Sequence, residues 1–380
     1  MEKKKKKYEK QLILPAGEFD VFLQALNKAG YEIIGPTVED QAIVFDTITS
    51  SSELPTGWTD EQNAGSYRLH KTEENLFFDF NVSPHSWKKR LHLANLLLWQ
   101  AKTNGSGFSI AESNGNIPKQ AFLGVRSCDA AAIEKQDKIF LQGDYIDTAY
   151  KSRRDQTLII TVNCSKAGGN CFCTSMETGP YAKSGYDLSL TEIKKNGRYF
   201  FYLEIGSDEG ASVLAGMPAL EEASVDDDSF VRDKMREVSK MMKKNVDTTD
   251  IKSLFYDNYD NSIWTKIAER CMNCANCTMV CPTCFCTNVE DVTDLTGAEA
   301  ERWRRWDSCF TMDFSYIHGG SVRPSAANRY RHWITHKFAA WHDQFDESGC
   351  VGCGRCITWC PVGIDITQEI QNLRKSKTPV

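Results

Sequence analysis

The chain has 380 residues, of which 41% are hydrophobic and 25% are charged, values typical of a globular protein with two or three domains. Its formal net charge of -6 argues against nucleic acid as a main partner, because a phosphate backbone would be repelled. The N-terminus has no apolar signal core, and the apolar stretch at residues 91–99 is too short to span a bilayer. We therefore expect a cytoplasmic protein without membrane insertion.

Patterns typical of helices and of strands alternate over the first 250 residues. In chain order, the periodicity predicts a helix at 17–29, strands at 42–45 and 75–80, a helix at 85–102, a strand at 121–125, a helix at 130–141, and strands at 157–162 and 198–205. This alternation indicates a mixed α/β domain, whose strand order the pattern leaves open.

The remainder of the chain has helical patterns only, at residues 229–244, 250–270, 298–314 and 325–345. We therefore predict an α+β protein of two domains. Residues 1–248 form the α/β domain, and residues 249–380 form an α-helical, ferredoxin-like domain. The polar segment at 243–249 is the expected connector.

Fifteen cysteines are the anomaly of the composition, and in a reducing compartment they indicate metal or redox chemistry. Two runs, CMNCANCTMVCP and CVGCGRCITWCP, share the spacing C-x2-C-x2-C-x3-C-P of two-cluster ferredoxins. The short loop carries three thiolates to one [4Fe-4S] cluster, and the fourth cysteine binds the other cluster. One ligand set is thus Cys271, Cys274, Cys277 and Cys360, and the other is Cys350, Cys353, Cys356 and Cys281. Paired structural zinc sites would need two x2 pairs separated by a longer loop, which does not explain this duplication.

The tetrapeptide Cys-Phe-Cys-Thr occurs twice, at 171–174 and 284–287. Cys128 is expected near the start of a helix capped by Ser127, where a thiolate is favoured, and Cys164 follows a predicted strand. We interpret Cys128, Cys164, Cys171 and Cys173 as ligands of a third [4Fe-4S] cluster. Reduced, buried thiols are the alternative.

The second copy supplies three thiols, from Cys284, Cys286 and Cys309. We interpret them as alternative ligands, or as hydrogen-bond donors to a neighbouring cluster.

Several segments beyond the ferredoxin runs resemble a known family. They are SCDAAAI from Ser127, NCFCTSM from Asn170 with TGP from Thr178, CPTCFC from Cys281, WDSC from Trp306, and HGG from His318. Over residues 120–365 the chain resembles the iron–sulfur β subunits of cytoplasmic nickel–iron sulfhydrogenases and the related A subunit of anaerobic sulfite reductase. Glu177 departs from the pattern, because the family has glycine there.

The resemblance implies a non-catalytic electron-transfer subunit. Its partners would be a flavin-containing, NAD(P)-handling diaphorase-type subunit and a catalytic subunit, a nickel–iron hydrogenase. No dinucleotide fingerprint or P-loop is found in the sequence, so nucleotide chemistry is assigned to the partners.

Other functions stay open at this point. The alternatives to a hydrogenase subunit are the electron-transfer A subunit of an anaerobic sulfite reductase and a subunit of a heterodisulfide-reductase-type complex. Two different classes are an iron–sulfur redox sensor and an enzyme that acts on sulfur compounds through Cys284, Cys286 or Cys309.

Overall fold

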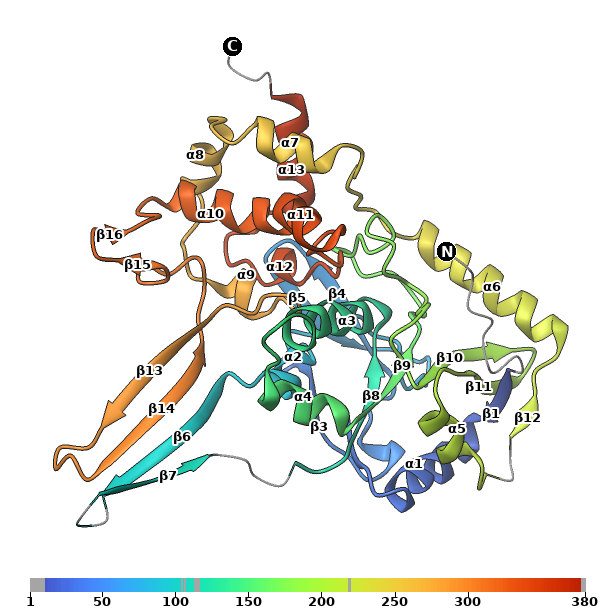
Figure 1. The fold of residues 1–380 in the computed structure, drawn as a ribbon. Coiled ribbons are helices and arrows are strands. Elements are labelled where there is room, and N and C mark those ends of the chain that lie inside the picture. Colours follow the sequence, from blue (N-terminus) through green and yellow to red (C-terminus); the bar gives the residue numbers. More distant parts are fainter. Residues whose placement is uncertain (1–10, 104, 106, 113–116, 218–219, 377–380) are drawn as a thin grey trace.

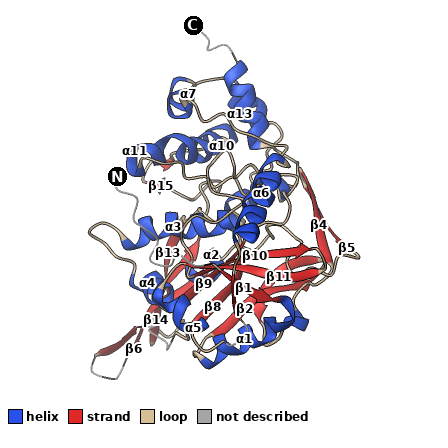
Figure 2. Ribbon diagram, turned by 90° about the vertical axis from the view of Figure 1, so that its right-hand side faces the viewer, coloured by secondary structure: helices blue, strands red, loops and turns tan. Residues whose placement is uncertain are grey.

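A computed structural model describes residues 11–103, 105, 107–112, 117–217 and 220–376. Figure 1 shows a mixed sheet at the lower right, a group of helices above it, and a ribbon of strands that projects to the lower left. Figure 2, turned by 90°, shows the same helices above the strands.

Eight strands of the described residues form the main sheet, in the order β12-β1-β11-β10-β9-β8-β2-β3. Their bounds are β1 Leu12–Pro15, β2 Glu32–Glu39, β3 Ala42–Thr47, β8 Gln120–Val125, β9 Thr157–Val162, β10 Leu188–Lys195, β11 Arg198–Ile205 and β12 Glu221–Glu222. The central strands β10, β9, β8 and β2 are parallel, and the pairings outside them are antiparallel.

The central strands are apolar on both faces because helices cover both. Side chains such as Leu123 and Ile160 pack with α1 (Phe19–Lys28) and α5 (Asp208–Leu214). Alternate residues such as Phe122 pack with α3 (Ser127–Leu141) and α4 (Thr148–Asp155) on the other face. The parallel strands β8 and β9 end at the same edge, so the segments that carry Cys128 and Cys164 begin there.

Helices from the C-terminal third surround a second core that contains Phe255, Trp333 and Phe338. They are α7 Ile251–Asp257, α8 Ile263–Ala268, α10 Ala326–Thr335, a π-helical turn at His336–Ala340, α11 Trp341–Phe345 and α13 Ile366–Lys375. The short helices α9 (Asn276–Met279) and α12 (Arg355–Thr358) lie inside the two cysteine runs. The partly buried ferredoxin cysteines pack against this core.

The remaining elements connect these layers. They are 3-10 turns at Ala16–Glu18 and Ser51–Glu53, α2 Lys88–Leu91, α6 Val225–Lys240, a hairpin of β4 Trp58–Asn63 and β5 Ser66–Lys71, and a pair β15 Tyr316–Ile317 and β16 Gly320–Ser321. At the tip of the β4–β5 hairpin, the Gly65 N–H donates to the Ile357 carbonyl at 3.0 Å. The hairpin therefore contacts the second cysteine run.

The predicted helices at 85–102 and 298–314 were wrong, and so was the prediction of an all-helical C-terminal third. A four-stranded antiparallel sheet, in the order β13-β14-β6-β7, occupies these regions. Its strands are β6 Asn95–Thr103, β7 Phe108–Glu112, β13 Thr287–Thr293 and β14 Glu299–Trp306. Charges that suggested a solvated helix instead pair across strands: Arg302 binds Asp291 at 2.7 Å, and Lys102 binds Glu299 at 2.8 Å.

This sheet joins segments from both sides of residue 248, because β6 pairs with β14. The division into residues 1–248 and 249–380 stays a prediction.

Three smaller predictions were also wrong. Residues 75–80 are not a strand, because the N–H groups of Phe77 and Phe78 donate to the Glu192 carboxylate instead of a neighbouring strand. The helix expected at 250–270 is split into α7 and α8, where the Asn261 side chain accepts the Ile263 N–H at 3.0 Å. Ser127 does not cap α3, since it is the first residue of that helix.

The other predicted elements are confirmed, at α1, β3, β8, α3, β9, β11, α6 and the α10–α11 segment.

A buried ion pair fixes the second cysteine run to helix α3. Arg355, at the start of α12, binds both carboxylate oxygens of Asp129 on α3, at 2.7 and 2.9 Å. Arg355 also donates to the carbonyl of Ser83 at 2.7 Å. Both partners of the pair are 1% exposed, so each charge depends on the other.

Asp129→Asn should destabilise the protein by about 3–5 kcal/mol, because it leaves the Arg355 guanidinium buried without its anion. The double variant Asp129→Leu/Arg355→Met should recover part of this loss, since neither charge remains. Urea unfolding measures both.

The matched control is Asp233→Asn, which breaks an exposed ion pair with Arg236. It should change the unfolding free energy by less than about 1 kcal/mol. If Asp129→Asn changes the unfolding free energy as little as this control does, the buried pair does not hold the second cysteine run against α3.

Candidate iron–sulfur sites

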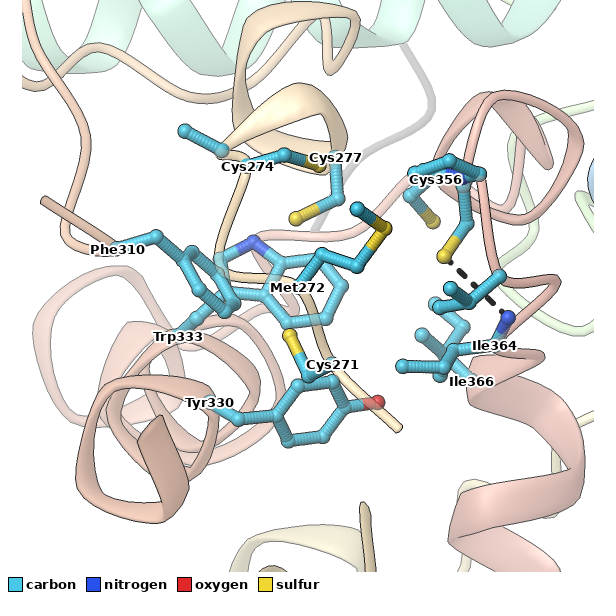
Figure 3. Close-up of a pocket in the computed structure, with 14 residues that line it drawn as sticks. Cys271, Met272, Cys274, Cys277, Phe310, Tyr330, Trp333, Cys356, Ile364 and Ile366 are labelled. Carbon is cyan, nitrogen blue, oxygen red and sulfur yellow. Dashed lines mark hydrogen bonds between the residues drawn. The ribbon is translucent and has the colours of Figure 1, made fainter. Parts of the chain in front are cut away.

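The cysteines of the first predicted ligand set line one pocket. Cys271, Cys274, Cys277 and Cys360 share it with the aromatic residues Phe310, Tyr330 and Trp333 and with Ile364 and Ile366. Figure 3 shows the sulfur atoms of Cys271 and Cys277 directed toward the same space, with Tyr330 and Trp333 beside them. The structure thus brings Cys360 together with the first run, as the crosswise pairing predicts, and Cys356 of the second run lines the same pocket.

The second predicted set lines another pocket. Cys281 meets Cys350, Cys353 and Cys356 there, with Phe172, Trp333 and Lys337 in the wall. Cys356 and Trp333 line both pockets, so the two sites share a wall. Which cysteines bind iron stays a prediction.

The two cysteine runs have the same backbone conformation. Asn273 and Ala275 in the first run and Gly352 and Gly354 in the second all have positive φ, between 53° and 78°. A four-residue helix follows at the same place in each run, α9 in one and α12 in the other. The repeated left-handed residues let each short loop turn its thiols toward one side.

Hydrogen-bond donors in the first pocket could bind the sulfur atoms of a cluster. Ile364 N–H donates to Cys360 Sγ at 3.3 Å, and this bond is dashed in Figure 3. The Tyr330 hydroxyl and the Trp333 indole nitrogen are buried and have no partner within the described part of the chain. Such donors stabilise the charge on cluster sulfur and raise its potential. The residues present thus fit a [4Fe-4S] cluster.

Cys128, Cys164, Cys171 and Cys173 come together beyond the second pocket. Cys128 and Cys173 pack in one buried group with Cys353, and Cys171 lies close to Cys164 and Cys353. Burial raises the pKa of Cys128, and Asp129 raises it further, so the helix N-terminus does not by itself favour the thiolate expected from the sequence. Deprotonation of this thiol needs a compensating positive group, as a metal would supply.

The first CFCT loop docks directly on the second cysteine run. The Phe172 N–H donates to the Gly352 carbonyl at 2.8 Å, and the Thr178 hydroxyl donates to the Val351 carbonyl at 2.6 Å. A Cβ on Gly352 would lie 2.7 Å from the Cys173 backbone, and one on Gly354 would lie 2.4 Å from the Asn170 carbonyl oxygen. Only glycine permits this approach.

Glu177, the departure from the family pattern, keeps the turn that a glycine would form. Its φ is +58°, and the Glu177 N–H donates to the Thr174 carbonyl at 3.2 Å. The side chain is exposed. The backbone beside Cys173 is therefore preserved at the cost of a strained residue.

The second CFCT copy forms two thiol pairs. Cys284 hydrogen-bonds with Cys281, and Cys286 hydrogen-bonds with Cys309. The bond from Cys309, with help from Lys337, lowers the pKa of Cys286 to about 7. The bond from Cys284 and the nearby Lys337 ammonium lower the pKa of Cys281.

Several residues of these sites were not predicted from the sequence. Lys88 and Lys337 are buried beside the second CFCT copy, although lysine is ordinarily a surface residue. Lys337 belongs to the stretch KFAAW, and the apolar residues that follow it are the one feature of the sequence that indicates its burial. Arg355 lies between two predicted ligands, but its partner Asp129 is far away in sequence.

Among the described residues, no group of at least three histidine, cysteine, aspartate or glutamate side chains has the arrangement that a single metal ion requires. A cubane spreads its ligands further, because each thiolate binds a different iron. No helix among the same residues is long and apolar enough to cross a membrane.

Comparison with known proteins agrees with these pockets. Residues 270–364 match the model of a 4Fe-4S dicluster domain, so the chain contains such a domain. The chain is also 32% identical over 262 residues to the beta subunit of sulfhydrogenase 2 from Pyrococcus furiosus. The alignment covers 68% of this chain and 75% of that protein. The chain therefore belongs to the sulfhydrogenase beta-subunit family. No solved structure matches it.

Glu177→Gly should stabilise the protein by about 0.5–1 kcal/mol, because relief of the left-handed strain exceeds the entropic cost of glycine. Thermal unfolding under anaerobic conditions measures the shift. Glu222→Gly, at an exposed β12 position outside the positive-φ residues, is the control and should not stabilise. A lower melting temperature for Glu177→Gly would mean that its side chain contributes more than the strain removes.

Proposed function

We propose that this protein is the electron-transfer subunit of a cytoplasmic, hydrogenase-type complex. It would pass electrons between a flavin-containing, NAD(P)-handling subunit and a catalytic subunit, a nickel–iron hydrogenase. Three [4Fe-4S] clusters are proposed, held by the two crosswise ligand sets and by Cys128, Cys164, Cys171 and Cys173. The dicluster domain and the family membership support the proposal.

One observation carries the proposal: the three cysteine groups are contiguous. Cys356 and Trp333 belong to both ferredoxin pockets. Cys171 Sγ lies 3.8 Å from the carbonyl oxygen of Cys353, which lines the second pocket. A row of adjoining sites suits a relay, whereas a sensor needs one accessible site.

The protein's own groups prepare these sites for one-electron chemistry, which iron–sulfur clusters supply when bound. Apolar and aromatic side chains, among them Phe310 and Ile366, form most of the wall of the first pocket. Backbone N–H groups of Gly352 and Ile364 donate to Cys350 Sγ and Cys360 Sγ, which stabilises negative charge on the sulfur. Arg355 and Arg126 place buried positive charge near Cys353 and Cys164.

The projecting four-stranded sheet is the proposed contact surface for a partner subunit. Its edge strands expose Phe108 and Ile110 on β7 and Val289 and Val292 on β13, and Leu295 at the β13–β14 turn is fully exposed. Exposed apolar residues on a protruding element are typical of an interface.

Loss of a ferredoxin ligand should separate two activities of the purified complex. In Cys360→Ser, hydrogen-driven reduction of the nicotinamide should fall to background, because the path between the subunits is broken. Hydrogen-driven reduction of a small viologen dye at the catalytic subunit should persist. Gln368→Ser, an exposed α13 position, is the control and should retain both.

Unchanged nicotinamide reduction in Cys360→Ser would refute the relay. Turnover of a sulfur compound by the isolated chain would instead favour an enzyme.

The third site is tested separately by iron and acid-labile sulfide analysis of anaerobically purified protein. Cys171→Ser/Cys173→Ser should contain about four fewer irons per chain than wild type, the content of one cubane. The EPR signals of the ferredoxin clusters should remain, which would exclude general unfolding. Thr174→Ser, in the same loop, should keep the wild-type content. Equal iron in the double variant and wild type would mean that these cysteines are structural thiols.

A further inference from the structure

The two cysteine runs differ in burial although their spacing and backbone conformation are the same. All fifteen cysteines lie in the described part of the chain, and Cys274 is the one among them that is exposed. Cys353, which stands at the same place in the second run, is 7% exposed. Met272 and Val351 also stand at the same place in the two runs, and they are 65% and 2% exposed. One motif is therefore open to solvent in the first run and covered in the second.

The first CFCT loop is the cover of the second run. Its Phe172 N–H donates to the Gly352 carbonyl at 2.8 Å, and Cys173 packs with Val351 and Cys353. This loop carries two of the proposed ligands of the third cluster. In the proposed relay, the covered face of the second run is thus the face across which electrons pass to the next site.

The same face of the first run is an apolar rim of the first pocket. Met272, Pro361 and Val362 line the pocket and are exposed. In Figure 3 the Met272 side chain extends across the pocket, in front of Trp333. Among the described residues that line this pocket, none is a lysine, arginine, aspartate or glutamate. Apolar side chains gathered where a predicted ligand reaches the surface indicate a contact surface.

We propose that this rim, formed by Met272, Cys274, Pro361 and Val362, is the surface through which the first cluster exchanges electrons with a partner subunit. The partner would present an uncharged, apolar surface with a one-electron carrier directly beneath it. That carrier would stand to the first run as the third cluster site stands to the second. The inference rests on the proposed relay, and the rim is a second contact surface besides the four-stranded sheet.

Distance favours this place over a buried one. Electron transfer slows steeply as the distance between two carriers grows, so a partner gains rate by docking where a cluster ligand is exposed. Cys274 is such a ligand in the predicted first set. The partner's carrier could then approach the first cluster without any rearrangement of this chain.

The partner would meet side chains at the rim and not the backbone. Gly352 and Gly354 admit the first CFCT loop because they have no Cβ. Asn273 and Ala275 stand at these places in the first run, so their Cβ atoms exclude an equally close approach. Met272 is the residue that extends furthest into solvent here, and its unbranched thioether adapts to the shape of a facing surface.

A polar groove beside the second pocket is the competing place of exchange. Cys350 lines it together with Lys138, Lys183 and Glu347. The groove carries both signs of charge, and Lys138 and Glu347 bind each other at 2.5 Å. A partner that docked there would need complementary charges, whereas the rim requires an apolar surface.

Met272→Asp in the purified complex tests the rim. Its carboxylate would be buried without a cation when the partner docks, so hydrogen-driven reduction of the nicotinamide should fall by about tenfold or more. Hydrogen-driven viologen reduction at the catalytic subunit should persist. Met272→Leu should retain both activities, because the rim stays apolar. Val225→Asp, at an 80% exposed position of α6, is the matched control and should also retain both.

The isolated Met272→Asp chain should keep the iron content and EPR signals of wild type, which separates a docking defect from loss of the cluster. If iron is lost, Val362→Asp on the same rim is measured instead and decides by the same criterion.

Three results would overturn the inference. Unchanged nicotinamide reduction in Met272→Asp, with loss in Cys360→Ser, would exclude the rim and leave the relay intact, whereas no loss in either would refute the relay itself. Loss in Lys183→Glu with none in Met272→Asp would place the exchange at the polar groove. A dimer of the isolated wild-type chain that becomes a monomer in Met272→Asp would assign the rim to a second copy of this chain.

Discussion

The bidentate ion pair between Arg355 and Asp129 is the interaction on which the arrangement of the sites depends. Arg355 stands inside the second cysteine run, and Asp129 stands in the first turn of α3, next to Cys128. The pair therefore positions two groups of cysteines at once. Because both side chains are 1% exposed, water cannot replace either partner, and the geometry is fixed.

Charge balance is the second constraint on this structure. Thiolates are anionic when they bind iron, and burial of the thiols works against that charge, as the raised pKa of Cys277 illustrates. At other cysteines, a buried cation lowers the thiol pKa and so opposes the effect of burial. Arg126 acts in this way near Cys164, and Lys337 does so beside Cys281. A protein with so many buried thiols needs such cations in its interior, where they would otherwise be unfavourable.

The features of the structure that depend on local residue spacing could be predicted from the sequence. Both cysteine runs, the strands β8, β9 and β11, and the places of Cys128 and Cys164 just after the ends of β8 and β9 follow from short-range patterns. The strands β6 and β14 could not be predicted in this way, because each is stabilised by a partner about 200 residues away. Their Leu, Glu and Arg residues favour a helix in isolation. The burial of Lys88 and Lys337, and of the Tyr330 hydroxyl that has no partner among the described residues, became apparent only from the structure.

The central claim is that adjoining cysteine groups hold a row of iron–sulfur clusters with crosswise ligands. Diffraction from anaerobically grown crystals, with anomalous data collected at the iron absorption edge, tests it most directly. The account predicts compact iron peaks between Cys360 and the first run and between Cys281 and the second run, with a third among Cys128, Cys164, Cys171 and Cys173. Iron bound within one run alone, or no iron beside Cys171 and Cys173, would contradict it.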